Sequence, residues 1–208
     1  MAFLEELRAS RLVAIVRGPD PEAALAATLT LAAAGIRFVE VSLTSTAALE
    51  VIARARAAIE PGTWLGAGTV LSAADVTDAA AAGASFIVTP AQGPSVAAAV
   101  TAGLPVVAGA LTPTEVAAAQ RDGATAVKLF PASLGGRAYL RALRDPFPDT
   151  AFVPVGGVDE QAAKEYLADG AVAVGVGSPL IAGATSGGSL AELRARARRF
   201  LDAVAAAS

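Results

Sequence analysis

The sequence of 208 residues carries a formal net charge of −3 and contains neither cysteine nor histidine. It therefore lacks a thiolate nucleophile, an imidazole base and the two commonest zinc ligands, which excludes disulfide and zinc chemistry. Hydrophobic residues make up 54% of the chain, enough for a large core, and the length predicts a single domain over residues 1–208.

The charge and the apolar pattern also limit the partners. An isoelectric point near 5.0 gives no electrostatic footprint for nucleic acid. Residues 1–8 are acidic and amphipathic, unlike a signal peptide, and no apolar run reaches membrane-spanning length without interruption. We expect a cytoplasmic protein with no nucleic-acid or membrane partner.

Apolar runs predict eight short strands, preceded by a helix near residues 2–9. Each run is almost continuously apolar, which is typical of a parallel sheet covered on both faces. In chain order the predicted strands are 13–17, 38–42, 64–69, 86–90, 105–109, 126–130, 151–155 and 172–176.

Alanine-rich helical stretches follow these runs. Each begins at a capping signal and many end at a glycine, the residue favoured just past a helix end. The predicted starts include Asp20, Ser45-Thr46, Ser72, Thr112, Asp159 and Ser189, and the glycines are Gly35, Gly83, Gly103, Gly123 and Gly170. Eight βα units predict an α/β fold, a (β/α)8 TIM barrel with a short extra N-terminal helix. An open doubly wound sheet is the alternative.

Lysine occurs at only two positions. Lys164 lies among charged residues typical of a helix surface, whereas Lys128 lies in the apolar run 126–131. Lysine is rarely buried without a partner, and burial of an amine favours its neutral, nucleophilic form. Lys128 is therefore a candidate nucleophile near the carboxyl end of the sixth strand, the end that carries the active site in such barrels.

Glu40 is the only acidic residue inside a strand-like apolar run. Strands two and six face each other across an eight-stranded barrel, whose interior is just wide enough for side chains. An amine near a carboxylate can attack a ketone to give a Schiff base while the carboxylate transfers protons. The structural alternatives are a Lys128 head that reaches water and a buried Lys128–Glu40 ion pair.

Glycine-rich turns follow the last two predicted strands, at Val155-Gly156-Gly157-Val158 and Gly175-Val176-Gly177-Ser178. In barrels these loops commonly present backbone N–H groups to a phosphate, and Ser178 adds a hydroxyl. A phosphorylated substrate follows as a hypothesis. Tight turns that need glycine for their backbone angles are the alternative.

Six segments form a specific combination: residues 14–18 (AIVRG), 39–41 (VEV), 65–70 (LGAGTV), 87–90 (IVTP), 127–132 (VKLFPA) and 156–158 (GGV). Together they resemble the 2-keto-3-deoxy-6-phosphogluconate (KDPG) aldolase family, including its 6-phosphogalactonate (KDPGal) branch. The resemblance extends over nearly the whole chain.

The resemblance implies a homotrimeric class I aldolase that needs no metal or other cofactor and releases pyruvate and D-glyceraldehyde 3-phosphate. Lys128 would form the Schiff base, and Glu40 would be the general acid and base, acting through water. The substrate-binding residues implied are Arg17, Thr69, Pro90 and Val155, and the phosphate ligands implied are Gly156, Gly157, Gly177 and Ser178.

Two positions depart from the phosphogluconate pattern. Thr44 replaces an arginine that commonly binds the substrate carboxylate, and Val155 replaces a threonine. Both residues look like the phosphogalactonate branch, which favours the galactonate compound or use of both C4 epimers. The missing arginine also weakens 4-hydroxy-2-oxoglutarate as a substrate.

The residues alone leave two further classes open. A phosphosugar isomerase or epimerase could use Glu40 as a base without an imine. A phosphate-ligand-binding barrel could use Glu40 and Lys128 only as a structural pair.

Overall fold

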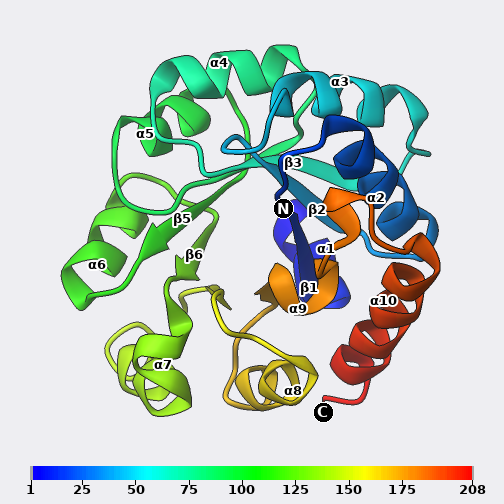
Figure 1. Cartoon of the computed structure of the whole chain (residues 1–208). Helices are drawn as coiled ribbons and strands as arrows, with labels where there is room; N and C mark the ends of the chain where they lie inside the picture. The colour runs from blue at the N-terminus through cyan, green and yellow to red at the C-terminus, as the bar shows by residue number, and fades with distance from the viewer. Residues whose placement is uncertain (1, 208) are drawn as a thin grey trace.

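The computed structural model describes residues 2–207, which form a barrel of parallel strands surrounded by helices (Figure 1). Neighbouring strands pair in the order β7-β6-β5-β4-β3-β2-β1-β8. The strands are β1 (Leu12–Val16), β2 (Phe38–Ser42), β3 (Trp64–Gly68), β4 (Phe86–Val88), β5 (Val106–Ala110), β6 (Ala126–Leu129), β7 (Phe152–Pro154) and β8 (Val174–Val176).

The barrel closes where β7 meets β8. A bridge joins Val155 to Gly175, and the Val172 N–H donates to the Phe152 carbonyl at 3.0 Å. This contact is sparser than the other strand pairs, so the barrel is nearly closed. The predicted (β/α)8 barrel is confirmed, and the open doubly wound sheet is wrong because strand order follows chain order around a ring.

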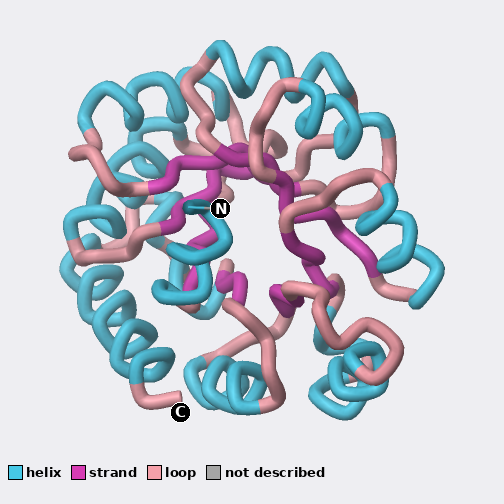
Figure 2. The backbone as a smooth tube through the Cα atoms, turned by 180° about the vertical axis from the view of Figure 1, so that it is seen from behind, coloured by secondary structure: helices cyan, strands magenta, loops and turns pink. Residues whose placement is uncertain are grey.

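Most of the helices cover the outside of the ring, as Figure 2 shows from the opposite side. The helices of the described residues are α1 (Ala2–Ser10), α2 (Pro21–Ala33), α3 (Ala48–Ala58), α4 (Ala73–Ala81), α5 (Pro94–Thr101), α6 (Pro113–Arg121), α7 (Gly136–Arg144), α8 (Glu160–Ala168), α9 (Ser178–Ile181) and α10 (Leu190–Ala205). Short 3-10 turns lie at Ala132–Leu134 (η1) and Ala184–Ser186 (η2). Among the helices of residues 2–207, none has the length and apolar character needed to cross a membrane.

Local signals account for most helix ends. Side chains cap the predicted starts at Asp20, Ser72, Thr112, Asp159 and Ser189. The five glycines predicted to follow helices have φ between +70° and +97°, angles that glycine adopts without strain.

The start predicted at Ser45-Thr46 is wrong. Helix α3 begins at Ala48 after Ala47, which has φ 51° and gives no side-chain cap. The Ser45 hydroxyl instead accepts from the Gly18 N–H at 3.2 Å. This hydrogen bond joins the turn after β2 to the loop after β1, so the Ser45 side chain does not cap α3.

Some strands are shorter than predicted. Arg17, Thr69 and Pro90 lie just past β1, β3 and β4 rather than within them. At Thr69 the reason is visible in the backbone, whose φ of 58° is incompatible with an extended strand. These three strands therefore end one or two residues earlier than predicted, and Arg17, Thr69 and Pro90 belong to the loops of the carboxyl face.

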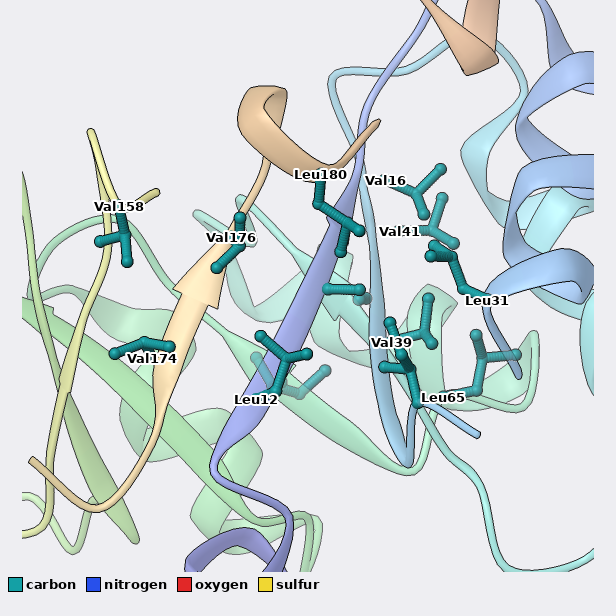
Figure 3. Packing of buried hydrophobic residues seen from close by; sticks show 14 of the residues in the cluster. Leu12, Val16, Leu31, Val39, Val41, Leu65, Val158, Val174, Val176 and Leu180 are labelled. Atoms are coloured by element: carbon teal, nitrogen blue, oxygen red, sulfur yellow. The ribbon is translucent and has the colours of Figure 1, made fainter. Parts of the chain in front are cut away.

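Side-chain alternation divides the core into two layers. Outward-facing residues such as Leu12, Val39 and Leu65 pack against the helices, and Figure 3 shows part of this layer. Inward-facing residues such as Val13, Phe38 and Val153 fill the barrel. Because side chains alternate along a strand, Glu40 and Ser42 share the inward face of β2 with Phe38.

Helix α1 closes the amino end of the barrel, and Figure 2 shows it within the ring of strands. Phe3 is 4% exposed, and its ring centroid lies 5.4 Å from Phe38, 5.0 Å from Trp64 and 5.4 Å from Phe86. The Glu6 carboxylate accepts from the Trp64 indole N–H at 3.1 Å. The interior is thus filled from this end, which leaves the carboxyl end for a cavity.

We predict that Phe3→Ala lowers the free energy of unfolding by about 3–5 kcal/mol, because it empties the aromatic contact that holds α1 in the barrel. Urea unfolding followed by the fluorescence of Trp64 measures the change. Val100→Ala is the control: Val100 is 41% exposed, so its loss should cost less than about 0.5 kcal/mol. Equal losses in the two variants would contradict the role given to Phe3.

Candidate active site

A cavity of about 700 Å³ opens at the carboxyl ends of the strands. Nine of the ten predicted site residues line it: Arg17, Thr69, Pro90, Lys128, Val155, Gly156, Gly157, Gly177 and Ser178. Glu40, the tenth, is buried beside it. The lining also includes Thr44 and residues that the sequence did not single out: Ile15, Phe130, Val158, Gly175, Pro179, Ile181 and Ala182.

Another hollow, of about 540 Å³, lies where α7 and α8 end and contains none of the predicted site residues. The Asp169 carboxylate, which lines it, is already bound by arginines. Asp169 accepts from Arg137 at 2.6 Å and from Arg141 at 3.0 Å, which lowers the pKa of the Asp169 carboxyl, the Arg137 hydrogen bond being the larger cause. We therefore assign this hollow to the packing of α7 on α8.

Lys128 lies on β6, where its register partners are Gly109 on β5 and Val153 on β7. The residue is only 5% exposed, and its Nζ lies 5.1 Å from the centroid of the Phe130 ring, two residues further on. Among the ion pairs of residues 2–207, none includes Lys128. The amine thus lies near the Phe130 ring and lines the cavity.

Glu40 lies on β2 between Ile15 of β1 and Gly66 of β3. It is 2% exposed, and its Oε1 occupies the space beside Gly68, where a β-carbon would approach it to 2.5 Å. Burial raises the pKa of the Glu40 carboxyl, and the charges of Lys128 and then Arg17 oppose this with smaller effects. The Lys128 effect acts through charge alone, so Glu40 and Lys128 influence each other without a direct hydrogen bond.

A cluster of hydroxyl groups lies beside this pair. The Arg17 side chain donates from Nε to the Ser42 hydroxyl and from Nη2 to the Thr69 hydroxyl, both at 3.2 Å. The Ser42 Oγ lies 2.9 Å from the Thr44 Oγ1 and 2.8 Å from the Thr69 Oγ1. Sequence reasoning missed Ser42, although its place two residues after Glu40 on the inward face of β2 could have identified it.

Thr69 is also strained, because a β-branched residue rarely adopts the left-handed φ of 58° seen here. Such strain tends to occur at functional sites, where the surrounding structure over-determines the backbone. Here it turns the Thr69 hydroxyl toward Arg17 and Ser42.

The loops after β7 and β8 form a further part of the rim of the cavity. Gly156 and Gly157 have φ angles of 103° and 75°, so the turn itself requires glycine. At these two positions the rim presents backbone to the cavity instead of a side chain. Beside it, α9 begins at Ser178, and its carboxyl end is held by Arg196 of α10, which donates to the Leu180 carbonyl at 2.6 Å.

The fold and the site define a class of protein: a barrel enzyme with an amine and a buried acid beside a cavity at its carboxyl end. A family model described as KDPG and KHG aldolase matches residues 4–193. The chain therefore belongs to the KDPG and KHG aldolase family, and it is a lyase.

Individual relatives agree. A 2-dehydro-3-deoxy-phosphogluconate aldolase of Treponema pallidum is 34% identical over 98% of each chain. A 2-dehydro-3-deoxy-6-phosphogalactonate aldolase of Escherichia coli is 36% identical over 81% of this chain and 83% of its own. A solved KDPG aldolase from Legionella pneumophila, with pyruvate captured as a covalent carbinolamine intermediate, matches 97% of this chain and 96% of its own at 26% identity, with a TM-score of 0.83.

We predict that Glu40→Gln stabilises the protein at pH 8 and that the gain shrinks toward pH 5. The raised pKa means that the folded state prefers the neutral acid, so its favourable contribution is complete below the pKa of the unfolded chain. That contribution is lost as the pH rises through the pKa of Glu40 in the folded protein. Glutamine does not ionise, so the Glu40→Gln variant does not lose this stability.

Urea midpoints between pH 5 and pH 8 measure this effect. Glu60→Gln is the control, because it makes the same chemical change at an exposed carboxylate. A gain for Glu40→Gln that is the same at every pH would sink the interpretation.

Proposed function

We propose that this protein is a class I aldolase that cleaves a 2-keto-3-deoxy-6-phospho sugar acid to pyruvate and D-glyceraldehyde 3-phosphate through a Schiff base on Lys128. The observation that carries the proposal is the buried Lys128 amine, which faces the cavity without an ion-pair partner in residues 2–207. Relatives named for the phosphogluconate and phosphogalactonate compounds support the substrate class.

The reaction begins with attack of the neutral amine on the C2 carbonyl carbon. The carbonyl oxygen takes up a proton to give a carbinolamine, and loss of water leaves an iminium ion. The covalent carbinolamine captured in the Legionella relative supports this step. The position of Lys128 in the lining of the cavity also supports it, because a bound ketone would lie beside the amine.

Carbon–carbon cleavage follows when a base removes the proton of the C4 hydroxyl. The C3–C4 bond breaks, its electron pair moves into the iminium ion to form an enamine, and the aldehyde leaves. Protonation at C3 and addition of water then release pyruvate and free the amine. We assign the proton transfers to Glu40, whose raised pKa suits a group that must both accept and return a proton.

The cavity fits a substrate of this kind. Its volume of about 700 Å³ is within the range of small-molecule sites. We place the pyruvyl half near Arg17, Thr69 and Pro90 and the phosphate at the rim formed by the loops after β7 and β8. The proposed phosphate ligands are Gly156, Gly157, Gly177 and Ser178, which line that rim.

Family membership favours this reaction over an isomerase or epimerase that uses Glu40 alone. A purely structural Glu40–Lys128 pair is disfavoured for a separate reason. A pair retained for structure is expected to be in direct contact, because the Coulomb attraction must offset the loss of hydration. No ion pair joins Glu40 to Lys128, although both residues are described.

We predict that borohydride in the presence of pyruvate adds the mass of one reduced pyruvate to Lys128. Lys128→Met should abolish this adduct and lower kcat by about four orders of magnitude or more, as expected for loss of a covalent nucleophile. The chain offers a matched control, since Lys164 is its only other lysine and is exposed. Lys164→Met should keep both adduct and activity; an adduct on Lys164, or none in the parent, would contradict the mechanism.

We predict that the parent cleaves the phosphogalactonate epimer at least as well as the phosphogluconate epimer, because Val155 and Thr44 match the former branch. Val155→Thr should shift the ratio of kcat/KM toward the gluconate compound by about tenfold, the usual effect of one side-chain group on discrimination. Coupled detection of pyruvate measures both substrates.

Thr44→Arg tests the other end of the substrate. It should improve cleavage of 4-hydroxy-2-oxoglutarate by supplying a cation for its carboxylate. A parent that strongly prefers the gluconate compound would rule out the reading of Val155 and Thr44.

A further inference from the structure

Ser42 is a fully enclosed polar group beside the cavity. It is fully buried at the end of β2, yet its hydroxyl contacts three polar side chains: Arg17, Thr44 and Thr69. A hydroxyl has one proton to donate and two lone pairs that accept. Three partners therefore saturate Ser42, which has nothing left to offer a substrate.

The number of donors and acceptors in the cluster limits how the three hydroxyl protons can be shared. Ser42 accepts from Arg17, so it can accept from only one of the two threonines and must donate to the other. The two bonds between hydroxyls consume two of the three hydroxyl protons. One proton remains, on Thr44 or on Thr69, and both of these residues line the cavity.

Arg17 depends on the same cluster. Its backbone is held on both sides, since the Thr185 hydroxyl donates to the Arg17 carbonyl at 2.8 Å and the following N–H of Gly18 donates to Ser45. Its guanidinium contacts the neutral hydroxyls of Ser42 and Thr69, and it forms no ion pair with any described residue. A neutral acceptor orients the cation without cancelling its charge, and unused N–H donors remain.

We propose that Ser42 is a positioning residue that holds the Arg17 guanidinium in place and directs one hydroxyl proton, from Thr44 or Thr69, to an acceptor in the cavity. The acceptor is a carboxylate or carbonyl oxygen of the 2-keto acid, and this identity rests on the proposed function. The division of labour follows from the contacts: Arg17 supplies charge, the threonines supply the proton, and Ser42 fixes both.

The first test does not depend on activity. In Ser42→Ala the Arg17 Nε loses its acceptor, so its proton should exchange with water at least tenfold faster in nitrogen-15 NMR spectra, with the signal assigned by its loss in Arg17→Met. Ser85→Ala is the matched control, because the Ser85 hydroxyl makes two hydrogen bonds to Leu65 at the other end of the barrel. Unchanged exchange in Ser42→Ala overturns the proposal.

The second test is a double-mutant cycle on kcat/KM for the phosphogalactonate substrate. Ser42→Ala alone should lower kcat/KM about ten- to hundredfold, because it frees a charged group. In an Arg17→Met background the same change should cost less than about threefold, since Ser42 acts largely through Arg17. An equal loss in both backgrounds, or a loss below twofold in the parent, overturns the proposal.

A third expectation separates positioning from simple loss of packing. Two charged groups act on Glu40: Lys128, which lies on β6, and Arg17, which follows β1. The neighbouring strand β3 places only Gly66 and Gly68 beside Glu40. A mobile Arg17 lowers the pKa of Glu40 less, so the acidic limb of the pH profile should move to higher pH in Ser42→Ala and stay in place in Ser85→Ala. If the parent traps no pyruvate on Lys128, the proposed function fails, and the exchange measurement still decides the role of Ser42.

Discussion

The candidate site depends on two buried side chains, Lys128 and Glu40, that lie in the same barrel interior without direct contact. A buried pair in contact would be a structural element whose charges neutralise each other. Here the two side chains influence each other through charge only, while burial dominates the protonation of Glu40 and raises its pKa. The amine and the acid are therefore each left with unused bonding capacity, and the cavity lies where both can use it.

The barrel makes this arrangement possible by the way it distributes volume. Aromatic side chains fill the amino end, where Phe3 of α1 meets Phe38, Trp64 and Phe86. Toward the carboxyl end, glycines replace large residues on the inward faces, and Gly68 leaves the space that the Glu40 carboxylate occupies. One end is thus solid and stable, and the other is hollow and polar, so stability and chemistry are carried by different layers of the same strands.

Sequence patterns predicted the ring of strands, the cap residues and nine of the residues that line the cavity, because these follow from alternation, helix signals and motifs. They did not predict the start of α3, where Ser45 bonds across to Gly18 instead of capping its own helix. Ser42 was missed for the same kind of reason. Alternation along β2 places Ser42 on the inward face, but its importance comes from Arg17 and Thr69, which lie far from it in the chain. The roles of Ser42 and Ser45 depend on contacts with other strands and loops, so they could not be derived from the local sequence alone.

The protonation of the site follows from its charges. The proposed Schiff-base reaction needs a neutral amine for attack and an acid to protonate the carbonyl oxygen as it becomes a hydroxyl. A carboxyl whose raised pKa favours the neutral form can supply that proton, which suits Glu40 to the first proton transfer of the proposed reaction. Arg17, bound to neutral hydroxyls, keeps a permanent positive charge in the same cavity. A carboxylate anchor for Arg17 would have cancelled that charge and with it part of the attraction for an anionic substrate, which explains why serine and threonine serve better there than aspartate or glutamate.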